Sequence, residues 1–264
     1  MKNAIVFLLL VFLIMCMYYI SYYSIIIDEQ PVNWESFQNE KIKNGWVDDY
    51  FDKVFVITLP KRKNNIYKIM KKMKIEPILF DAIDKNTLDL DKLKKQNKVS
   101  EVCKMNNGRI ACHLSHLKVM ETFLKDPKAK NALIFEDDLQ PPRDMYEIKN
   151  TIHNVMNTLP DDWDLIYFGK CWDVCRHSKK INEYIYKSHP LCRHGYAVSR
   201  KGAKKLLKEC FPIVNMHGDQ HIKKLSQKGK VNIYTSEPSI FFQNRNQFGT
   251  TIGNHGLLKL CMNM

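Results

Sequence analysis

The 264-residue sequence is short of acidic side chains and contains no site for N-linked glycosylation. Its 28 Asp and Glu stand against 41 Lys and Arg, and the formal charge of +13 favours contact with anionic partners such as nucleic acid, anionic lipid or a diphosphate. The lysines are scattered, with no stripe of base-stacking aromatic residues beside them. We therefore expect a solvated basic surface and no nucleic-acid partner.

Charge is also absent near the N-terminus, where the 24 residues from Ala4 to Ile27 are all uncharged. As a helix they would span about 36 Å, enough to cross the hydrocarbon core of a bilayer. The run is longer than the apolar part of a cleavable signal peptide and ends in Tyr and Ile, which favours an uncleaved signal-anchor. Lys2 precedes the run, whereas Asp28 and Glu29 follow it. The positive-inside rule then predicts a type II single-pass protein whose globular domain is lumenal, as in the endoplasmic reticulum or Golgi.

Internal repeats and low-complexity linkers are absent as well. With 45% hydrophobic residues the chain can bury one sizeable core, so we expect one globular domain. The predicted organisation is a cytosolic N-terminus over residues 1–3, a transmembrane signal-anchor over 4–27, a short stem over 28–50 and the globular domain over 51–264.

The cysteine and asparagine usage of the chain favour different compartments. Seven cysteines follow the apolar segment, which suits one or more lumenal disulfides and, because seven is odd, leaves at least one free thiol. No asparagine lies in an Asn-x-Ser/Thr sequence, which favours a cytosolic or otherwise unglycosylated domain. Cys171, Cys175, Cys192 and Cys210 lie in one stretch, and we interpret Cys171 and Cys175 as a disulfide pair or as buried thiols rather than as metal ligands.

Short apolar runs alternate with segments of helical spacing over the rest of the sequence. The run VFVITL from Val54 is typical of a buried strand, and the apolar residues of 64–74 have helical spacing. Further strands are predicted at PILFDAI, ALIF and DLIYFG, and helices over 113–124, 145–158 and 201–210. This alternation predicts an α/β layered fold with a mostly parallel sheet.

The run ALIFEDDLQPP places three carboxylates directly after a predicted strand. On an extended backbone Glu136 and Asp138 point to the same side, where a hard divalent cation would bridge them to a diphosphate. Sheets of this class bind ligands at the carboxyl ends of their strands, which is where the cluster falls. Taken alone, an exposed acidic turn is the alternative interpretation.

Several motifs surround this cluster in a fixed order: VFVITLPKR, DAID, NNGRIACHLSHLKVMETFL, EDD, DWDLIYFGK, HGYAVSRKGAKKLL and MHGDQHI. In that order the chain resembles glycosyltransferase family 25, which includes bacterial lipopolysaccharide transferases and animal procollagen galactosyltransferases. The resemblance covers nearly all of Val54 to Ile252. It implies a GT-A type fold with a Rossmann-like sheet, and inverting transfer of a hexose, galactose or glucose, from a UDP-sugar with Mn²⁺ (or Mg²⁺). The acceptor would be a hydroxyl of a protein, such as a collagen-like hydroxylysine, or of a glycan.

The resemblance also implies roles for individual residues. Glu136 and Asp138 would occupy the metal and diphosphate positions, with Asp137 supporting them. The chain departs from the family at Arg109 and Ala111, where an acid and a second glycine are common, and this bears on donor or acceptor preference. The other matched positions are Thr58, Leu59 and Arg62 at the strand end that would meet the nucleotide, Asp84 of the DAID segment, Ser115 and His116 of the helix motif, and the isolated acid Asp219.

Asp219 is the candidate general base, because inverting transfer needs a group that takes the proton of the acceptor hydroxyl. Gly218-Asp219 also precedes an apparent helix, QHIKKL, so a helix N-cap is the alternative role, and one residue can fill both.

Histidine pairs offer rival metal ligands. His217 and His221 stand at i, i+4, and His113 and His116 at i, i+3. HGDQH lacks the glutamate of the zinc-protease motif, and no third ligand can be identified from the sequence, so zinc is the weaker interpretation.

The main alternative function is that of a catalytically inactive family member acting as a binding or adhesion protein. Intact acidic residues argue against it. A nucleic-acid-binding function rests on charge alone.

Overall fold

The computed structural model describes Met15 and residues 47–140, 142–173 and 178–248. Its contacts divide the chain into Met1–Lys41 and Ile42–Met264, and all described residues except Met15 belong to the second unit. The predicted signal-anchor, apart from Met15, and the stem up to residue 46 lie outside the described residues. Within the described ranges, no helix combines the length and apolarity that a membrane crossing requires.

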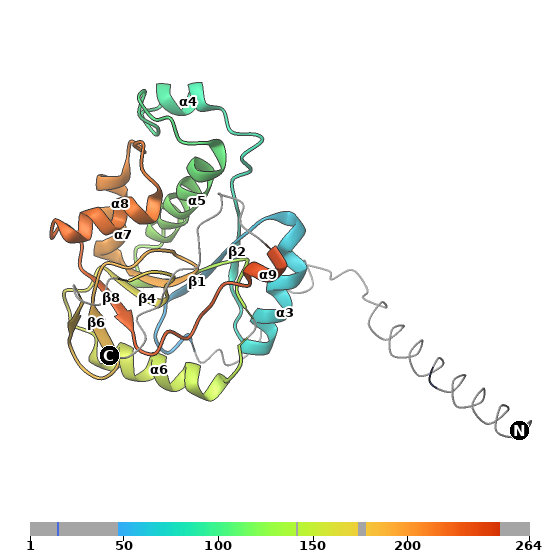
Figure 1. The fold of residues 1–264 in the computed structure, drawn as a ribbon, viewed down its shortest axis with the longest axis vertical. Helices are drawn as coiled ribbons and strands as arrows, with labels where there is room; N and C mark the ends of the chain where they lie inside the picture. The colour runs from blue at the N-terminus through green and yellow to red at the C-terminus, as the bar shows by residue number, and fades with distance from the viewer. Residues whose placement is uncertain (1–14, 16–46, 141, 174–177, 249–264) are drawn as a thin grey trace, which may run out of the picture. The chain divides into compact units, whose positions relative to one another are not determined.

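A mixed sheet of eight strands forms the centre of the described structure (Figure 1). Its strands lie in the order β2-β1-β3-β7-β4-β8-β6-β5. Their bounds are Lys53–Thr58 (β1), Ile78–Asp81 (β2), Asn131–Glu136 (β3), Leu165–Gly169 (β4), Lys179–Lys180 (β5), Ile185–Lys187 (β6), Gly195–Ser199 (β7) and Ile233–Ser236 (β8).

Strand direction agrees with the predicted mostly parallel sheet. Strand β1 is parallel to β2 and β3, and β4 is parallel to β8. Strand β7 is antiparallel to both its neighbours, β3 and β4, and β6 is antiparallel to β5 and β8. All strands except β6 and β7 therefore run in one direction. The alternation of strands and helices in the sequence did not predict the insertion of the antiparallel strand β7 between β3 and β4.

Helices cover both faces of this sheet. Four of the helices begin at a polar side chain that accepts a backbone hydrogen bond, as N-capping residues do: Asp89 at α4, Asn106 at α5, Asp144 at α6 and Ser199 at α7. The bounds are Pro60–Arg62 (the 3₁₀ helix η1), Lys63–Met73 (α3), Leu90–Lys95 (α4), Asn107–Leu124 (α5), Met145–Thr158 (α6), Arg200–Cys210 (α7), Gly218–Gln227 (α8) and Arg245–Phe248 (α9).

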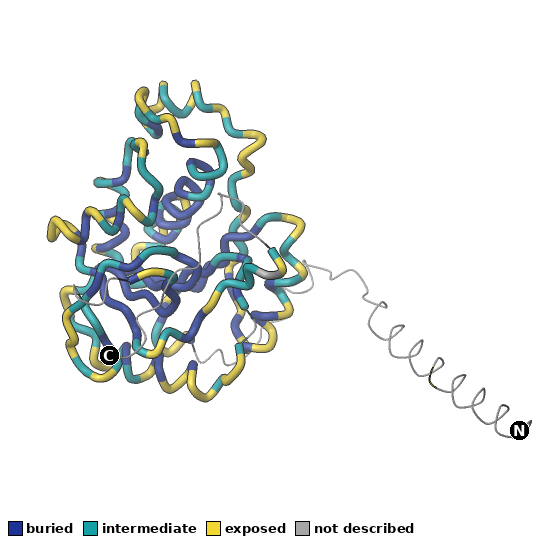
Figure 2. The backbone as a smooth tube through the Cα atoms, in the orientation of Figure 1, coloured by how far each residue is buried: buried dark blue, intermediate teal, exposed yellow. Residues whose placement is uncertain are grey.

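Alternate residues of β1, β3, β4, β7 and β8 supply two separate cores, one on each face of the sheet. The middle of the sheet is accordingly the buried part of the fold (Figure 2). In β1, Phe55 and Ile57 pack with α5, α7 and α8, whereas Val54 and Val56 pack with α3 and α6. Val47, from the end of the predicted stem, also belongs to the second core and is 1% exposed.

The register of the first strands sets the position of the site. Thr58, the last residue of β1, pairs with Asp81 of β2, and Ile57 pairs with Glu136 of β3. Three parallel strands thus end at one edge of the sheet, and the segments that follow them leave side by side.

Candidate active site

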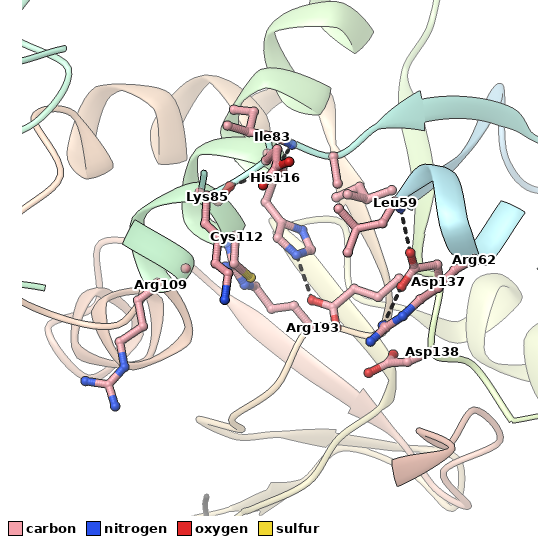
Figure 3. A pocket seen from close by; sticks show the side chains of 18 of the residues that line it. Leu59, Arg62, Ile83, Lys85, Arg109, Cys112, His116, Asp137, Asp138 and Arg193 are labelled. Carbon is pink, nitrogen blue, oxygen red and sulfur yellow. Dashed lines mark hydrogen bonds and ion pairs between the residues drawn. The ribbon is translucent and has the colours of Figure 1, made fainter. Parts of the chain in front are cut away.

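A cleft of about 520 Å³ opens at this edge, a volume that suits a small-molecule ligand (Figure 3). Nine of the ten predicted site residues line it: Leu59, Arg62, Asp84, Ser115, His116, Glu136, Asp137, Asp138 and Asp219. The tenth, Thr58, is fully buried beneath it, and its hydroxyl donates to the Leu59 carbonyl at 3.1 Å. The fold therefore brings together predicted site residues that are up to 160 positions apart in the sequence, from Leu59 to Asp219.

Asp137 joins the ends of β1 and β3. One carboxylate oxygen accepts the Leu59 N–H at 2.7 Å, and the other accepts from the Arg62 guanidinium at 2.9 Å (Figure 3). Both side chains of this ion pair are buried. Asp137 therefore ties the turn after β3 to the end of β1 and to η1, beside Glu136 and Asp138.

Glu136 and Asp138 converge on one amide group. The Gln243 Nε2 atom lies 3.0 Å from Asp138 Oδ2 and 3.4 Å from Glu136 Oε2. The predicted cause was an extended backbone, but β3 ends at Glu136, and Asp137 and Asp138 form a turn. The two carboxylates still lie on the same side, because the turn folds back toward Gln243.

One oxygen of the acidic pair lacks a hydrogen-bond partner among the described residues. Asp138 Oδ1 is buried and has no hydrogen-bond partner among the described residues. Burial, followed by the charges of Glu136 and Asp137, raises the pKa of Asp138 to about 7. Burial also raises the pKa of Glu136, against the opposing charges of His194 and Arg193. A hard divalent cation would stabilise the ionised pair and take up the unpartnered oxygen, so these residues fit one.

His116 of α5 orients the Glu136 carboxylate. Its Nε2 lies 2.8 Å from Glu136 Oε1, and its Nδ1 lies 3.0 Å from the Tyr196 hydroxyl. Burial, then the charge of Arg193, holds the pKa of His116 well below its usual range. With an ionised Glu136, the neutral ring donates from Nε2 and accepts from Tyr196, which fixes one tautomer.

Ser115 and Asp84 shape the loop after β2. The Ser115 hydroxyl donates to the Ala111 carbonyl at 2.7 Å and accepts the Ile83 N–H at 2.9 Å, so this serine ties the loop to α5. Asp84 is exposed at the cleft, and its carboxylate accepts the Asn86 N–H at 2.9 Å. Both residues therefore have contacts that hold the loop in place.

Asp219 lies in the first turn of α8 and lines the cleft. The N-cap of this helix is His217, so the alternative that Asp219 is the cap is corrected. One Asp219 oxygen accepts the Gln220 N–H at 2.8 Å, and the other accepts the Cys192 N–H at 3.2 Å. The carboxylate thus links α8 to the segment that precedes β7.

That segment is closed by a disulfide between Cys171 and Cys192. A backbone bridge between Trp172 and Leu191 brings the two cysteines together, which the spacing of the sequence does not reveal. The predicted pairing of Cys171 with Cys175 is therefore wrong, because Cys171 pairs with Cys192. Cys175 itself lies outside the described residues. Among the described cysteines, Cys103, Cys112 and Cys210 are free.

Most of the positive charge of the cleft was missed by sequence reasoning. Arg193 is buried, with 4% exposure, and Arg245 donates to Cys171 Sγ at 3.1 Å and to Gln243 Oε1 at 3.0 Å. Arginine carries no spacing signal of its own, and these two lie far from the acidic cluster in sequence. The cations that line the cleft are Lys61, Arg62, Lys85, Arg109, Arg193 and Arg245.

A cleft at the carboxyl ends of parallel strands, lined by both carboxylates and cations, is typical of the α/β proteins whose sites suit a small anionic ligand. Comparison with known families narrows this class. Residues 51–222 match the model of glycosyltransferase family 25 (LPS biosynthesis protein), and the chain belongs to that family.

Relatives with curated names include procollagen galactosyltransferases and insect family members. Procollagen galactosyltransferase 2 of Mus musculus is 24% identical over 222 residues, which cover 73% of this chain and 35% of that protein. Procollagen galactosyltransferase 1-A of Xenopus laevis is 28% identical over 230 residues, 78% of this chain and 36% of that protein. The glycosyltransferase 25 family member of Anopheles gambiae is 32% identical over 112 residues, 40% of this chain and 18% of that protein. The chain spans about a third of the length of the procollagen galactosyltransferases it matches.

We predict that the disulfide holds the wall of the cleft that carries Asp219. Replacing both Cys171 and Cys192 by Ser should lower Tm by roughly 5–10 °C, because opening such a loop costs about 2–4 kcal/mol. Exchange of the backbone amide hydrogens should become faster at residue 192 and at the start of α8. Cys103→Ser is the control, since that thiol is outside the cleft. Unchanged exchange at the start of α8 would show that the disulfide is not needed to hold Asp219.

Proposed function

We propose that this protein is a metal-dependent, inverting hexosyltransferase of GT-A type that uses a UDP-sugar donor and a hydroxyl acceptor. The observation that carries the proposal is the convergence of Glu136 and Asp138 at the strand edge, with Asp138 Oδ1 buried and unpartnered within the described residues. Mn²⁺ or Mg²⁺ held by these carboxylates would supply charge stabilisation for a departing diphosphate. The family membership agrees with this chemistry.

The nucleotide would bind along the end of β1 and η1. Leu59 and Arg62 line this part of the cleft, and Asp137 holds both in place. Arg193 and Arg245 also line the cleft, where their charge favours a diphosphate. Asp84, at the loop after β2, would contact the nucleoside or the sugar.

Asp219 would act as the general base from the start of α8. It lies outside the acidic pair, and among the described residues each of its oxygens accepts one hydrogen bond, so a lone pair remains for the acceptor proton. The acceptor oxygen forms a bond to the anomeric carbon as the bond from that carbon to the diphosphate oxygen breaks. The acceptor proton passes to Asp219, and the bonding electrons leave with UDP.

The donor and the acceptor follow from the relatives rather than from the cleft. The relatives named procollagen galactosyltransferase favour galactose and a collagen-like hydroxylysine. The alternative donor sugar is glucose, and the alternative acceptor is a hydroxyl of a glycan. A panel of UDP-sugars, each with collagen peptides and with glycan acceptors, identifies the pair.

Removal of either metal-binding carboxylate should abolish turnover. We predict that Glu136→Gln and Asp138→Asn each lower the rate of UDP release by roughly 10³-fold or more, because a neutral amide of similar shape does not hold the cation. Steady-state kinetics with a Mn²⁺ titration measures this effect. Asp91→Asn, at an exposed acid on α4, is the control. Near-normal, metal-dependent turnover in either variant would reduce the cluster to an acidic turn.

The Asp219→Asn variant tests the base. We predict a fall in kcat of roughly 10² to 10⁴ with UDP and Mn²⁺ affinities close to wild type. Measurement of kcat, nucleotide affinity and Tm on this variant separates the roles. A loss of stability that accounts for the fall in kcat would indicate that Asp219 only positions Cys192, and an unchanged kcat would remove it from the mechanism.

We also propose that residues 4–27 anchor the protein with its catalytic domain in the lumen. The uncharged run and its flanks support this topology, and the Cys171–Cys192 disulfide suits an oxidising compartment. In sealed vesicles, the catalytic domain should resist added protease until detergent is supplied. Digestion without detergent would exclude the lumenal topology, and release by alkaline carbonate would exclude the anchor.

A further inference from the structure

Three helices bring two histidines and a cysteine together away from the acidic pair. His113 comes from α5, Cys210 from the end of α7, and His221 from α8. Ligand-type atoms of these three residues all lie within 4.8 Å of one another. The sequence had paired His113 with His116 and His217 with His221, whereas the fold pairs His113 with His221 and adds the third ligand that spacing did not reveal.

Two ring nitrogens of this cluster lack partners. His113 Nε2 and His221 Nδ1 are buried and have no hydrogen-bond partner within the part of the chain that the structure describes. His113 and Cys210 are 1% and 0% exposed. A buried polar atom without a partner destabilises the folded protein, so two such atoms beside a thiol require an explanation.

We propose that His113, Cys210 and His221 form a binding site for a borderline-soft transition metal ion, with Zn²⁺ the best match, that joins α5, α7 and α8. Two imidazoles and one thiolate are a ligand set that zinc prefers over Mn²⁺ or Mg²⁺. Water would occupy the fourth position, and it would enter from the side of His221, which is the partly exposed ligand.

The three ligands need only a small closure. In a tetrahedral zinc site the ligand atoms stand about 3.3–3.8 Å apart, as follows from Zn–N and Zn–S bonds of about 2.0 and 2.3 Å. The separations here reach at most 4.8 Å. His221 is near the surface, where a change of rotamer supplies the difference.

Two proton changes accompany binding. Burial raises the pKa of Cys210 to about 12, so the metal must displace its thiol proton. Arg193 donates to His113 Nδ1 at 3.4 Å, which leaves the ring proton on Nε2. Binding through Nε2 moves this proton to Nδ1 and breaks that long contact. Since the outer nitrogen faces a cation rather than a carboxylate, we expect weaker binding than in a fully supported zinc site.

The site would connect to the catalytic cleft through Gly218. A Cβ atom at this position would stand 2.4 Å from His113 Nδ1 and 2.6 Å from an Arg193 nitrogen, so only glycine permits this close approach. Gly218 is the first residue of α8 and Asp219 is the next. An ion bound to His113 and His221 would thus fix the helix end from which Asp219 enters the cleft.

The test uses the full-length protein in detergent, stripped of metal and titrated with Zn²⁺ and with Co²⁺. We expect one Co²⁺ ion to give a thiolate-to-cobalt charge-transfer band that Zn²⁺ removes. Zn²⁺ at about 100 times its Kd should raise Tm by roughly 5–10 °C. His221→Gln and Cys210→Ser should each lose the band and most of the rise in Tm. The partly exposed His221 makes His221→Gln the variant expected to fold normally.

Three matched variants control the assignment. His153→Gln replaces an exposed histidine of α6, and Cys103→Ser a free cysteine outside the cluster, so both should keep the band. Cys112→Ser matters most, because Cys112, His116 and Glu136 form another group of close ligand atoms at the cleft. A band that disappears in Cys112→Ser and persists in Cys210→Ser would place the ion in the cleft and overturn the proposal. Absence of any band or shift in Tm with the wild-type protein would overturn it equally.

Discussion

The ion pair between Asp137 and Arg62 is the interaction on which the site depends. The Asp137 carboxylate also accepts the Leu59 N–H, so a single side chain joins the end of β1 to the turn after β3. The Arg62 side chain is largely buried as well. Loss of either partner would therefore leave the other charge buried and unpaired, which destabilises the fold. Because this contact holds the turn, Glu136 and Asp138 on either side of Asp137 are aimed at the cleft.

Around that contact, the cleft is built from two parts of the chain. One part, from β1 to the turn after β3, supplies the carboxylates and the loop after β2. The other supplies Arg193, Asp219, Gln243 and Arg245, held to one another by the Cys171–Cys192 disulfide and its hydrogen bonds. Acidic and basic side chains from both parts thus line one cleft, and a diphosphate with a divalent cation would complement both charges.

The sequence predicted those helices and strands that are specified by a local pattern of apolar residues. Helix α6 begins and ends at the predicted residues 145 and 158, since its apolar residues have helical spacing and Asp144 caps it. Strand β7 was not predicted, because GYAVS is short and buried on both faces, and such a run has no period that separates a strand from a helix. Its antiparallel insertion is a tertiary choice of pairing.

The site was legible where it consists of acids next to a strand end, and not where it depends on distant contacts. Gln243 is 105 positions from Asp138, and an amide has no charge or spacing that marks it as a partner of a carboxylate. The pairing of Cys171 with Cys192 depends on the backbone bridge beside them.

That same contact between Gln243 and Asp138 has a consequence for biosynthesis. The family match ends at residue 222, yet the acidic pair meets its amide partner only after residue 243 has left the ribosome. At about 5–20 residues per second, β1 and β3 would be synthesised several seconds before Gln243 and Arg245. A nascent chain arrested in that interval would contain Glu136 and Asp138 but not the Gln243 amide that contacts them.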